Sequence, residues 1–219
     1  NASIVAADID GGSTDNCGIV SLSASSTAFT CADVGTNNVT LTVDDGNGNT
    51  ADCVAFVTVN DTISPVAVCQ NIDIYLDGSG NASIVAADID GGSTDNCGVA
   101  GLSASTTDFS CADVGANNVK LTVDDGNGNS VDCVAVVTVN DTISPAAVCQ
   151  NITVYLDDSG NASIEAADID SGSTDNCDLT LSASKTTFTC ADVGTNNVTL
   201  TVEDSSGNSS DCVAVVTVA

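Results

Sequence analysis

Cysteine is the residue type with the clearest capacity for covalent chemistry here, because 11 of the 219 residues are cysteine. The first spacings are 14, 22, 16 and 28 residues, counted from Cys17 through Cys31, Cys53 and Cys69 to Cys97. Thiolate zinc sites use close pairs of the form Cys-x2–4-Cys, so these spacings disfavour zinc. Regular cysteines in a secreted chain are typical of a disulfide framework. The sequence therefore predicts disulfides and a secreted, extracellular or cell-surface protein.

Carboxylates are the second group that could do chemistry. Calcium takes six to eight oxygen ligands, which Asp, Asn and backbone carbonyls in tight turns supply. The candidate calcium ligands lie in one recurring acidic loop and in the segment that precedes each Thr-Ile-Ser-Pro: Asp8, Asp10, Asp15, Asp61, Asp88, Asp90, Asp95, Asp141, Asp168, Asp170 and Asp175. The loop departs from the EF-hand pattern, since Ser13 occupies its sixth position and no Glu its twelfth. A solvated acidic surface with Asx turns is the alternative interpretation.

The turn Asp45-Gly-Asn-Gly-Asn49 is also rich in oxygen ligands. Left-handed backbone positions favour Gly or Asn, so turn chemistry explains this segment better than metal ligation. No cofactor is required by the sequence, and calcium is the one optional ligand that it indicates.

The charge balance excludes several classes of function. The chain has 30 acidic residues, the two cations Lys120 and Lys185, and no histidine, for a formal charge of −28. No basic surface is present to bind nucleic acid. Without histidine the usual general base is missing, and nearly identical acidic loops argue against a single glycosidase-like site, so we expect no enzyme. No apolar run reaches about 18 residues, so no membrane span is expected.

An internal repeat determines the expected architecture. The sequence NASIVAADIDGGSTDNCG begins at Asn1 and again at Asn81, and NASIEAADIDSGSTDNCD begins at Asn161, a period of 80 residues. The cysteines follow this period, apart from one residue missing after Cys177. The chain is therefore expected to be a tandem array.

Within one period the pattern is that of strands. Asn37–Asp45 alternates apolar and polar residues with period two, the Asp-Gly-Asn-Gly-Asn turn follows, and Ala51–Val59 forms the partner strand. The further candidate strands are Ser3–Ala7, Ile19–Ala24, Ala28–Ala32 and Val66–Leu76. Short strands separated by turns predict an all-β fold of small β-sandwich domains.

Each period also resembles a known family. The resemblance rests on these residues and segments: Phe109–Gly115 (Phe-Ser-Cys-Ala-Asp-Val-Gly), Val119–Asp124, Gly128-Asn129, Cys133, Val137–Val139, Asp141, Pro145 and Cys149. They resemble a hyalin-type (HYR-like) repeat. The Asp-Asn-Cys segment and its added cysteine pair resemble the version found in long surface proteins of gliding, type IX-secreting bacteria.

The resemblance covers most of each period and implies tandem immunoglobulin-like β-sandwich domains with a period of about 80 residues. In its frame the domains are 1–60, 61–140 and 141–219, which we call the first, second and third modules. Such modules serve as spacers and adhesive units, and the family has no catalytic residues to transfer to this chain.

The same frame implies a set of disulfides. The first and last strands of a module would be joined by Cys69–Cys133 and Cys149–Cys212. Inner pairs would be Cys17–Cys31, Cys97–Cys111 and Cys177–Cys190. Cys53 is left unpaired, and the first module is expected to lack its opening strand. In a rival frame, whose units start at Asn1, Cys53 pairs with Cys69 and Cys212 is left unpaired.

The orphan cysteine has two explanations. The simpler expectation is that the sequence is a window from a longer array, whose signal peptide has been removed or lies upstream. The other is a strand donated by a neighbouring chain, as in pilin assembly.

Two threonines are candidate glycosylation sites. Asp61-Thr62-Ile63 recurs as Asp141-Thr142-Ile143 and resembles the Asp-Ser/Thr-aliphatic O-glycosylation signal of the same bacterial group. Both lie in segments expected to link modules, where a transferase could reach Thr62 and Thr142.

We therefore expect a structural extracellular array that forms a stalk or filament, whose partners are neighbouring repeats of the same or identical chains. The alternative is an adhesive module that binds a glycan or a surface, with or without calcium. Tyr75 and Tyr155 lie in strand patterns, so core or edge packing is expected for both.

Overall fold

The computed structural model describes residues 1–219, and its only helices are short 3-10 turns. The elements of the first module are β1 (Ala2–Ser3), η1 (Ala6–Ile9), β2 (Ser21–Ala24), β3 (Ala28–Phe29), η2 (Cys31–Asp33), β4 (Gly35–Asp44) and β5 (Thr50–Val59). Those of the second are β6 (Ile72–Tyr75), β7 (Asn81–Ser83), η3 (Ala86–Ile89), β8 (Gly101–Ala104), β9 (Asp108–Ser110), η4 (Cys111–Asp113), β10 (Gly115–Asp124) and β11 (Ser130–Asn140).

Those of the third are β12 (Ile152–Val154), β13 (Asn161–Ser163), η5 (Ala166–Ile169), β14 (Leu179–Ala183), β15 (Thr187–Thr189), η6 (Cys190–Asp192), β16 (Gly194–Asp204) and β17 (Ser209–Val218). None of the 3-10 helices has the length and apolar character needed to cross a membrane.

The chain divides into two compact units. One consists of Asn1–Val68, Asp90–Ser103 and Thr122–Cys133, and the other of Cys69–Ile89, Ala104–Leu121 and Val134–Ala219. The second module therefore contributes to both units. The module boundaries expected from the sequence stay a prediction.

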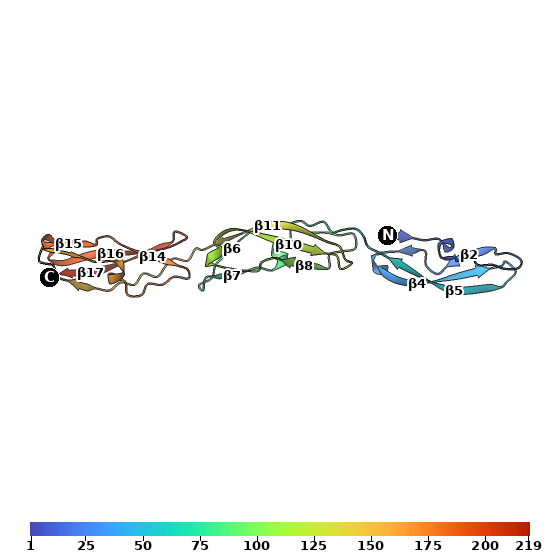
Figure 1. The fold of residues 1–219 in the computed structure, drawn as a ribbon, viewed down its shortest axis with the longest axis horizontal. Coiled ribbons are helices and arrows are strands. Elements are labelled where there is room, and N and C mark those ends of the chain that lie inside the picture. Colours follow the sequence, from blue (N-terminus) through green and yellow to red (C-terminus); the bar gives the residue numbers. More distant parts are fainter. The chain divides into compact units, whose positions relative to one another are not determined.

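The third module shows how alternation in the sequence builds a core. Strands β12, β17, β16 and β14 form one sheet in that order, and β13 and β15 form a second sheet (Figure 1). Because side chains alternate across a strand, Val198, Leu200 and Val202 of β16 face inward and are fully buried. They pack with Val216 of β17 and Phe188 of β15. The module is thus a small β-sandwich.

The first module repeats this arrangement with one difference. Its larger sheet has the order β2-β4-β5, and β1 pairs with β3. In the third module β12 pairs in parallel with β17, with Ile152 opposite Val216, and β6 pairs with β11 in the same way. The strand β5 has no such partner, so it forms the edge of its sheet.

Two expected strands are shorter than predicted because side chains close turns. Ser3–Ala7 is a strand only at Ser3, because the Asp8 carboxylate accepts a hydrogen bond from the Val5 N–H at 2.8 Å and η1 begins there. Ala28–Ala32 ends as a strand at Phe29, because the Asp33 carboxylate accepts from the Thr30 N–H and caps η2.

The strand expected over Val66–Leu76 is also shorter. Only Ile72–Tyr75 forms β6, and Val66 makes an isolated bridge to Thr94.

Replacing Leu200 by alanine should lower the free energy of unfolding by about 2–5 kcal/mol, because it removes a fully buried side chain and leaves a cavity. Chemical denaturation of the full chain measures this loss when the unfolding transition of the third module is monitored. The control is Val213→Ala on β17, where the valine is 57% exposed and the loss should be well under half as large. Equal losses would contradict the assigned core.

Candidate metal centres where the modules join

The structure brings carboxylates together at two equivalent places. One cluster consists of Asp61, Asp95 and Asp125, and one oxygen from each lies within 4.8 Å of the others. The other cluster consists of Asp141, Asp175 and Asp204, under the same limit. In each cluster one residue comes from the segment after the preceding module and one from the Asp-Asn-Cys loop. The third lies where the hairpin turn begins: Asp125 directly follows β10, and Asp204 is the last residue of β16.

The turn residue of each cluster is held by hydrogen bonds from its own turn. Asp125 accepts from the N–H groups of Asn127 and Asn129 at 2.8 and 3.0 Å, and from the Asn129 side chain at 2.6 Å. Burial acts to raise the pKa of Asp125, but the Asn129 side chain and these N–H groups outweigh it, so the pKa lies below its ordinary value. Both Asp125 and Asp204 are 5% exposed. The turn thus holds a buried carboxylate in its charged form.

The same balance applies at Asp204. Burial acts to raise its pKa, and hydrogen bonds from the Asn208 side chain and from the N–H groups of Asn208 and Ser206 lower it below the ordinary value. The two N–H groups lie 2.8 Å from Oδ1.

The loop residue of each cluster uses one oxygen for a turn and leaves the other free. Asp95 accepts from the Cys97 N–H at 2.7 Å through Oδ2, and Asp175 accepts from the Cys177 N–H at 2.9 Å. The Oδ1 atoms of both are buried and have no hydrogen-bond partner. An orphaned buried carboxylate oxygen is costly unless something binds it.

The linker residue of the second cluster, Asp141, is likewise incompletely satisfied. Asp141 Oδ1 accepts from the Ile143 N–H and from the Asn176 side chain, both at 3.1 Å. Asp141 is only 7% exposed, and its Oδ2 is buried without a partner, as is Oδ1 of Asn176. Asn208 joins the linker to the turn, because its amide donates to the Asp141 carbonyl at 3.2 Å and to Asp204.

These residues fit a calcium ion. At about 5 Å, two like charges repel by roughly 3 kcal/mol at an effective dielectric constant of about 20, so three carboxylates need a counter-charge. The orphaned oxygens of Asp95, Asp141 and Asp175 are hard ligands, and no histidine exists to favour a transition metal. Calcium accepts several carboxylates in flexible geometry, whereas magnesium requires a stricter octahedron.

A disulfide joins successive modules beside each cluster. Cys31 of the first module is bonded to Cys97 of the second, and Cys111 of the second to Cys177 of the third. Each bond therefore includes the cysteine two residues after the loop aspartate. A covalent bond and a carboxylate cluster thus occur together at each junction.

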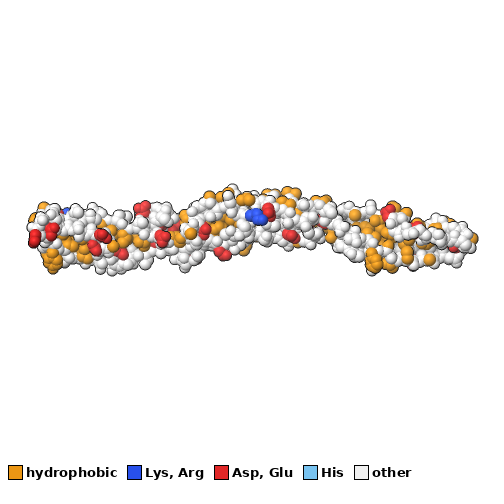
Figure 2. Space-filling view, in the orientation of Figure 1, with side chains coloured by type: hydrophobic (Ala, Val, Ile, Leu, Met, Phe, Trp, Pro, Cys, Tyr) orange, Lys and Arg blue, Asp and Glu red, His pale blue; other side chains and the backbone are white.

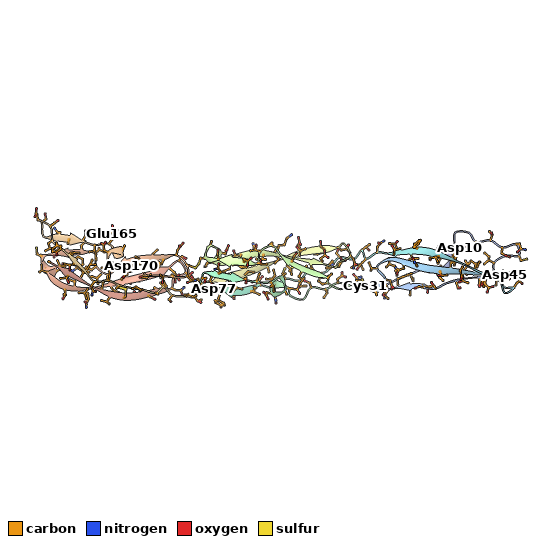
Figure 3. All side chains as sticks on the ribbon, turned by 90° about the horizontal axis from the view of Figure 1, so that it is seen from below. Asp10, Cys31, Asp45, Asp77, Glu165 and Asp170 are labelled. Carbon is orange, nitrogen blue, oxygen red and sulfur yellow. A yellow bond between two sulfur atoms is a disulfide. The ribbon has the colours of Figure 1, made fainter.

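These bonds correct the expected inner pairs Cys17–Cys31, Cys97–Cys111 and Cys177–Cys190. The Val20 N–H donates to the Asp44 carbonyl, so the segment after Cys17 lies at the end of β4. Cys31 instead precedes the start of β4, and Figure 3 shows Cys31 and Asp45 at opposite ends of the β4–β5 hairpin. Ten residues of strand span about 30 Å, far beyond the roughly 7 Å that a disulfide allows.

The other cysteines fall into two groups. Cys149 is bonded to Cys212, as expected, and Cys69 and Cys133 are both disulfide-bonded. Cys17, Cys53 and Cys190 are free and exposed. The rival pairing of Cys53 with Cys69 is wrong, since Cys53 is free.

Only some of the expected calcium ligands come together. Asp61 and Asp95 meet in one cluster, and Asp141 and Asp175 in the other. The remaining candidates lie in neither: Asp8, Asp10, Asp15, Asp88, Asp90, Asp168 and Asp170.

Hydrogen bonds in turns account for most of these seven. Asp88 and Asp168 accept the N–H at the start of their 3-10 helix, as Asp8 does. Asp10, Asp90 and Asp170 accept from a serine three residues on, and those hydrogen bonds lower the pKa of each.

The turn aspartates Asp125 and Asp204 were missed as ligands, because turn chemistry explained them fully. Turn stabilisation and metal ligation are compatible, because the turn that Asp125 stabilises also places the Asp125 carboxylate close to the linker. The available signal was recurrence: linker, loop and turn aspartates repeat together in the second and third modules. In the first module Asp15 and Asp45 occupy the loop and turn positions, and neither belongs to a cluster.

Close packing where the second and third modules join explains why one position of a turn is a glycine. Gly80 has φ +73°, and a Cβ there would lie 2.5 Å from the Asn176 carbonyl oxygen and 2.6 Å from Cys111 Sγ. Only glycine therefore permits the Asp-Asn-Cys loop of the third module to lie against this turn.

The candidate glycosylation sites Thr62 and Thr142 are both exposed. Modification of either stays a prediction.

Comparisons with known proteins do not identify a family for this chain. No family model and no curated protein matches the chain. Among solved structures, extracellular cadherin domains 1–4 of protocadherin gamma B7 align with 86% of this chain and 59% of their own, at 12% identity and a TM-score of 0.36. Protocadherin gamma C5 EC1-3 aligns with 84% of this chain and 77% of its own, at 11% identity and a TM-score of 0.38.

Domains 3–5 of Drosophila OTK align with 88% of this chain and 73% of their own, at 7% identity and a TM-score of 0.34. Likeness at this level carries no information about what the chain binds.

Non-reducing peptide mapping of the full chain should recover Cys31 linked to Cys97 and Cys111 linked to Cys177. The reason is that these pairs lie in bonding contact, whereas Cys17 and Cys31 lie at opposite ends of the first module. Thiol alkylation before digestion supplies the control, with label expected at Cys17, Cys53 and Cys190. Recovery of Cys17 linked to Cys31 would contradict the structure.

Proposed function

We propose that the chain is a structural segment of an extracellular repeat array, a stalk or filament in which calcium and a disulfide fix each junction. The observation that supports this most strongly is that a carboxylate cluster and a disulfide occur together at each junction. Each compact unit contains one carboxylate cluster with at least one orphaned buried oxygen and one disulfide between modules.

The disulfides support the extracellular location. Such bonds persist in oxidising compartments and are rare in the cytosol. Here they join sandwiches with small cores and few aromatic residues, which gain stability from covalent links. The finer identity that we propose is that of tandem immunoglobulin-like, HYR-like modules with the 80-residue period of the sequence.

Calcium would act on the linker. Asp61 and Asp141 are the first residues of the second and third modules and begin the linker segment that follows the last strand of the preceding module, whereas their cluster partners lie in the loop and turn of the same module. An ion bound by all three would join the linker to that module and remove their mutual repulsion. A joint so fixed resists bending, which is what a stalk requires.

The alternative is an adhesive module, and one observation favours it. Tyr75 and Tyr155 are expected to pack in the core or on an edge; Tyr75 lies on the edge strand β6, Tyr155 directly follows the edge strand β12, and the two residues are 61% and 75% exposed. Exposed aromatic rings at equivalent positions are suited to stacking on sugars or other flat ligands. In both proposals the chain is not an enzyme and does not bind nucleic acid, given its charge of −28 and lack of histidine.

Calcium titration tests the proposal. Isothermal calorimetry on the metal-free chain should detect two sites, in the range of about 0.1–1 mM found for extracellular modules. At about 10 mM calcium, each ion would stabilise its module by roughly 1.4–2.7 kcal/mol. Asp204→Asn should remove one site, because it removes one of three carboxylates from one cluster.

The matched control is Asp45→Asn. Asp45 accepts the same hydrogen bonds from Asn47 and Asn49 as its counterparts do, but it belongs to no cluster. This variant should keep both sites and the full calcium-induced rise in melting temperature. Absence of binding to the metal-free chain, or an equal loss in Asp45→Asn and Asp204→Asn, would overturn the calcium proposal.

A further inference from the structure

The two carboxylate clusters differ at one position of the hairpin turn beside them. Asn127 of the second module and Ser206 of the third are equivalent, because the N–H of each donates to Oδ1 of the turn aspartate, Asp125 or Asp204, at 2.8 Å. The linker, loop and turn positions of both clusters are all aspartates. The clusters therefore supply the same three carboxylates and differ in the side chain that the turn places next to them.

Asn127 contacts the linker carboxylate of the first cluster. Its side-chain amide donates to the Asp125 carbonyl at 3.3 Å and, in a longer contact of 3.5 Å, to Oδ2 of Asp61. Oδ1 of Asp61 accepts from the Ile63 N–H at 3.1 Å and from the Asn96 side chain at 3.4 Å. Both oxygens of Asp61 therefore already have donors.

Ser206 leaves the corresponding oxygen of the second cluster without a donor. Oδ1 of Asp141 accepts from the Ile143 N–H and the Asn176 side chain, in the same way as Oδ1 of Asp61. Oδ2 of Asp141, however, is buried and has no partner, because the short serine side chain does not donate to it. An ion that binds to this oxygen displaces no protein donor.

We propose that the two clusters fill with calcium at different concentrations, and that the side chain at position 127 or 206 sets the order. This inference rests on the proposed calcium sites and states how they are regulated. The cluster of Asp141 fills first, because its Oδ2 is free to bind the ion. The cluster of Asp61 fills second, because the ion must displace the Asn127 amide from Oδ2. At intermediate calcium only the linker that begins at Asp141 is tied to its module.

The displaced amide determines the size of the difference. A hydrogen bond changes an equilibrium constant by roughly 2–10-fold, so the dissociation constants of the two clusters should differ by a factor in this range. The amide also places a positive end of its dipole beside the first cluster. This reduces the repulsion among the carboxylates before calcium binds, and so leaves less repulsion for the ion to remove.

Variants with one intact cluster allow each site to be measured alone. Isothermal calorimetry with calcium on the Asp204→Asn chain reports on the first cluster, and on the Asp125→Asn chain it reports on the second. Acidic side chains elsewhere lie dispersed on the face drawn in Figure 2, and single carboxylates bind calcium more weakly than a cluster. The dissociation constant of the second cluster should be roughly 2–10-fold lower than that of the first.

The decisive variant is Asn127→Ser in the Asp204→Asn chain, which should tighten calcium binding by most of that factor. The matched control is Asn47→Ser in the same chain. Asn47 makes the same contacts within its own turn, to Oδ1 and the carbonyl of Asp45 at 2.8 and 3.4 Å, but Asp45 belongs to no cluster. The control should leave the calcium affinity unchanged.

A second measurement needs no substitution. The N–H groups of Cys97 and Cys177 donate to the loop aspartates Asp95 and Asp175, so their NMR signals report on the first and second clusters. In a calcium titration of the unaltered chain, the Cys177 signal should reach half of its shift at a lower calcium concentration than the Cys97 signal.

The outcomes separate this inference from the proposal on which it rests. Absence of calcium binding at both clusters would overturn the calcium sites and this inference together. Three results would overturn this inference alone and leave the calcium sites standing: equal affinity of the two clusters, tighter binding by the first cluster, or no gain in affinity from Asn127→Ser.

Discussion

The disulfides between modules are the constraint on which the rest of this structure depends. Each joins the start of a 3-10 helix in one module to the Asp-Asn-Cys loop of the next, as Cys31–Cys97 and Cys111–Cys177 do. That bond holds the loop against the preceding module, and the same loop supplies Asp95 or Asp175 to the carboxylate cluster. Covalent and electrostatic features of the junction therefore come from one short loop, which explains why they recur together.

The strong negative charge of the chain is the second constraint on the structure. With 30 acidic side chains against two lysines, the chain repels itself, which keeps it soluble but destabilises any place where carboxylates are buried. Most aspartates avoid this cost through turns, where N–H groups or serine hydroxyls hold the carboxylate at the surface. Asp125, Asp141 and Asp204 are instead buried close to other carboxylates. Asp141 and the neighbouring Asp95 and Asp175 each keep a buried oxygen without a hydrogen-bond partner, which supports the proposed cation sites.

Much of the fold could be predicted from the sequence, and the failures have physical causes. Alternation of Val, Leu and Thr predicts β4, β10 and β16, and the Cys149–Cys212 bond follows from the first and last strands of one module lying side by side. The inner pairs fail because spacing along the chain ignores the length of β4 and the proximity of the next module. Asp125 and Asp204 were missed because a residue's role in its own turn conceals its contact with the linker. The exposure of Tyr75 and Tyr155 could not be predicted, since a strand pattern does not say which face is covered.

The most direct test of the central claim is a crystal structure of the chain grown with calcium, with anomalous difference density collected to locate the ions. The account predicts two peaks, each about 2.3–2.6 Å from carboxylate oxygens, one among Asp61, Asp95 and Asp125 and the other among Asp141, Asp175 and Asp204. Peaks at the loop aspartates Asp10, Asp90 and Asp170 instead, or no peak at either cluster, would contradict it.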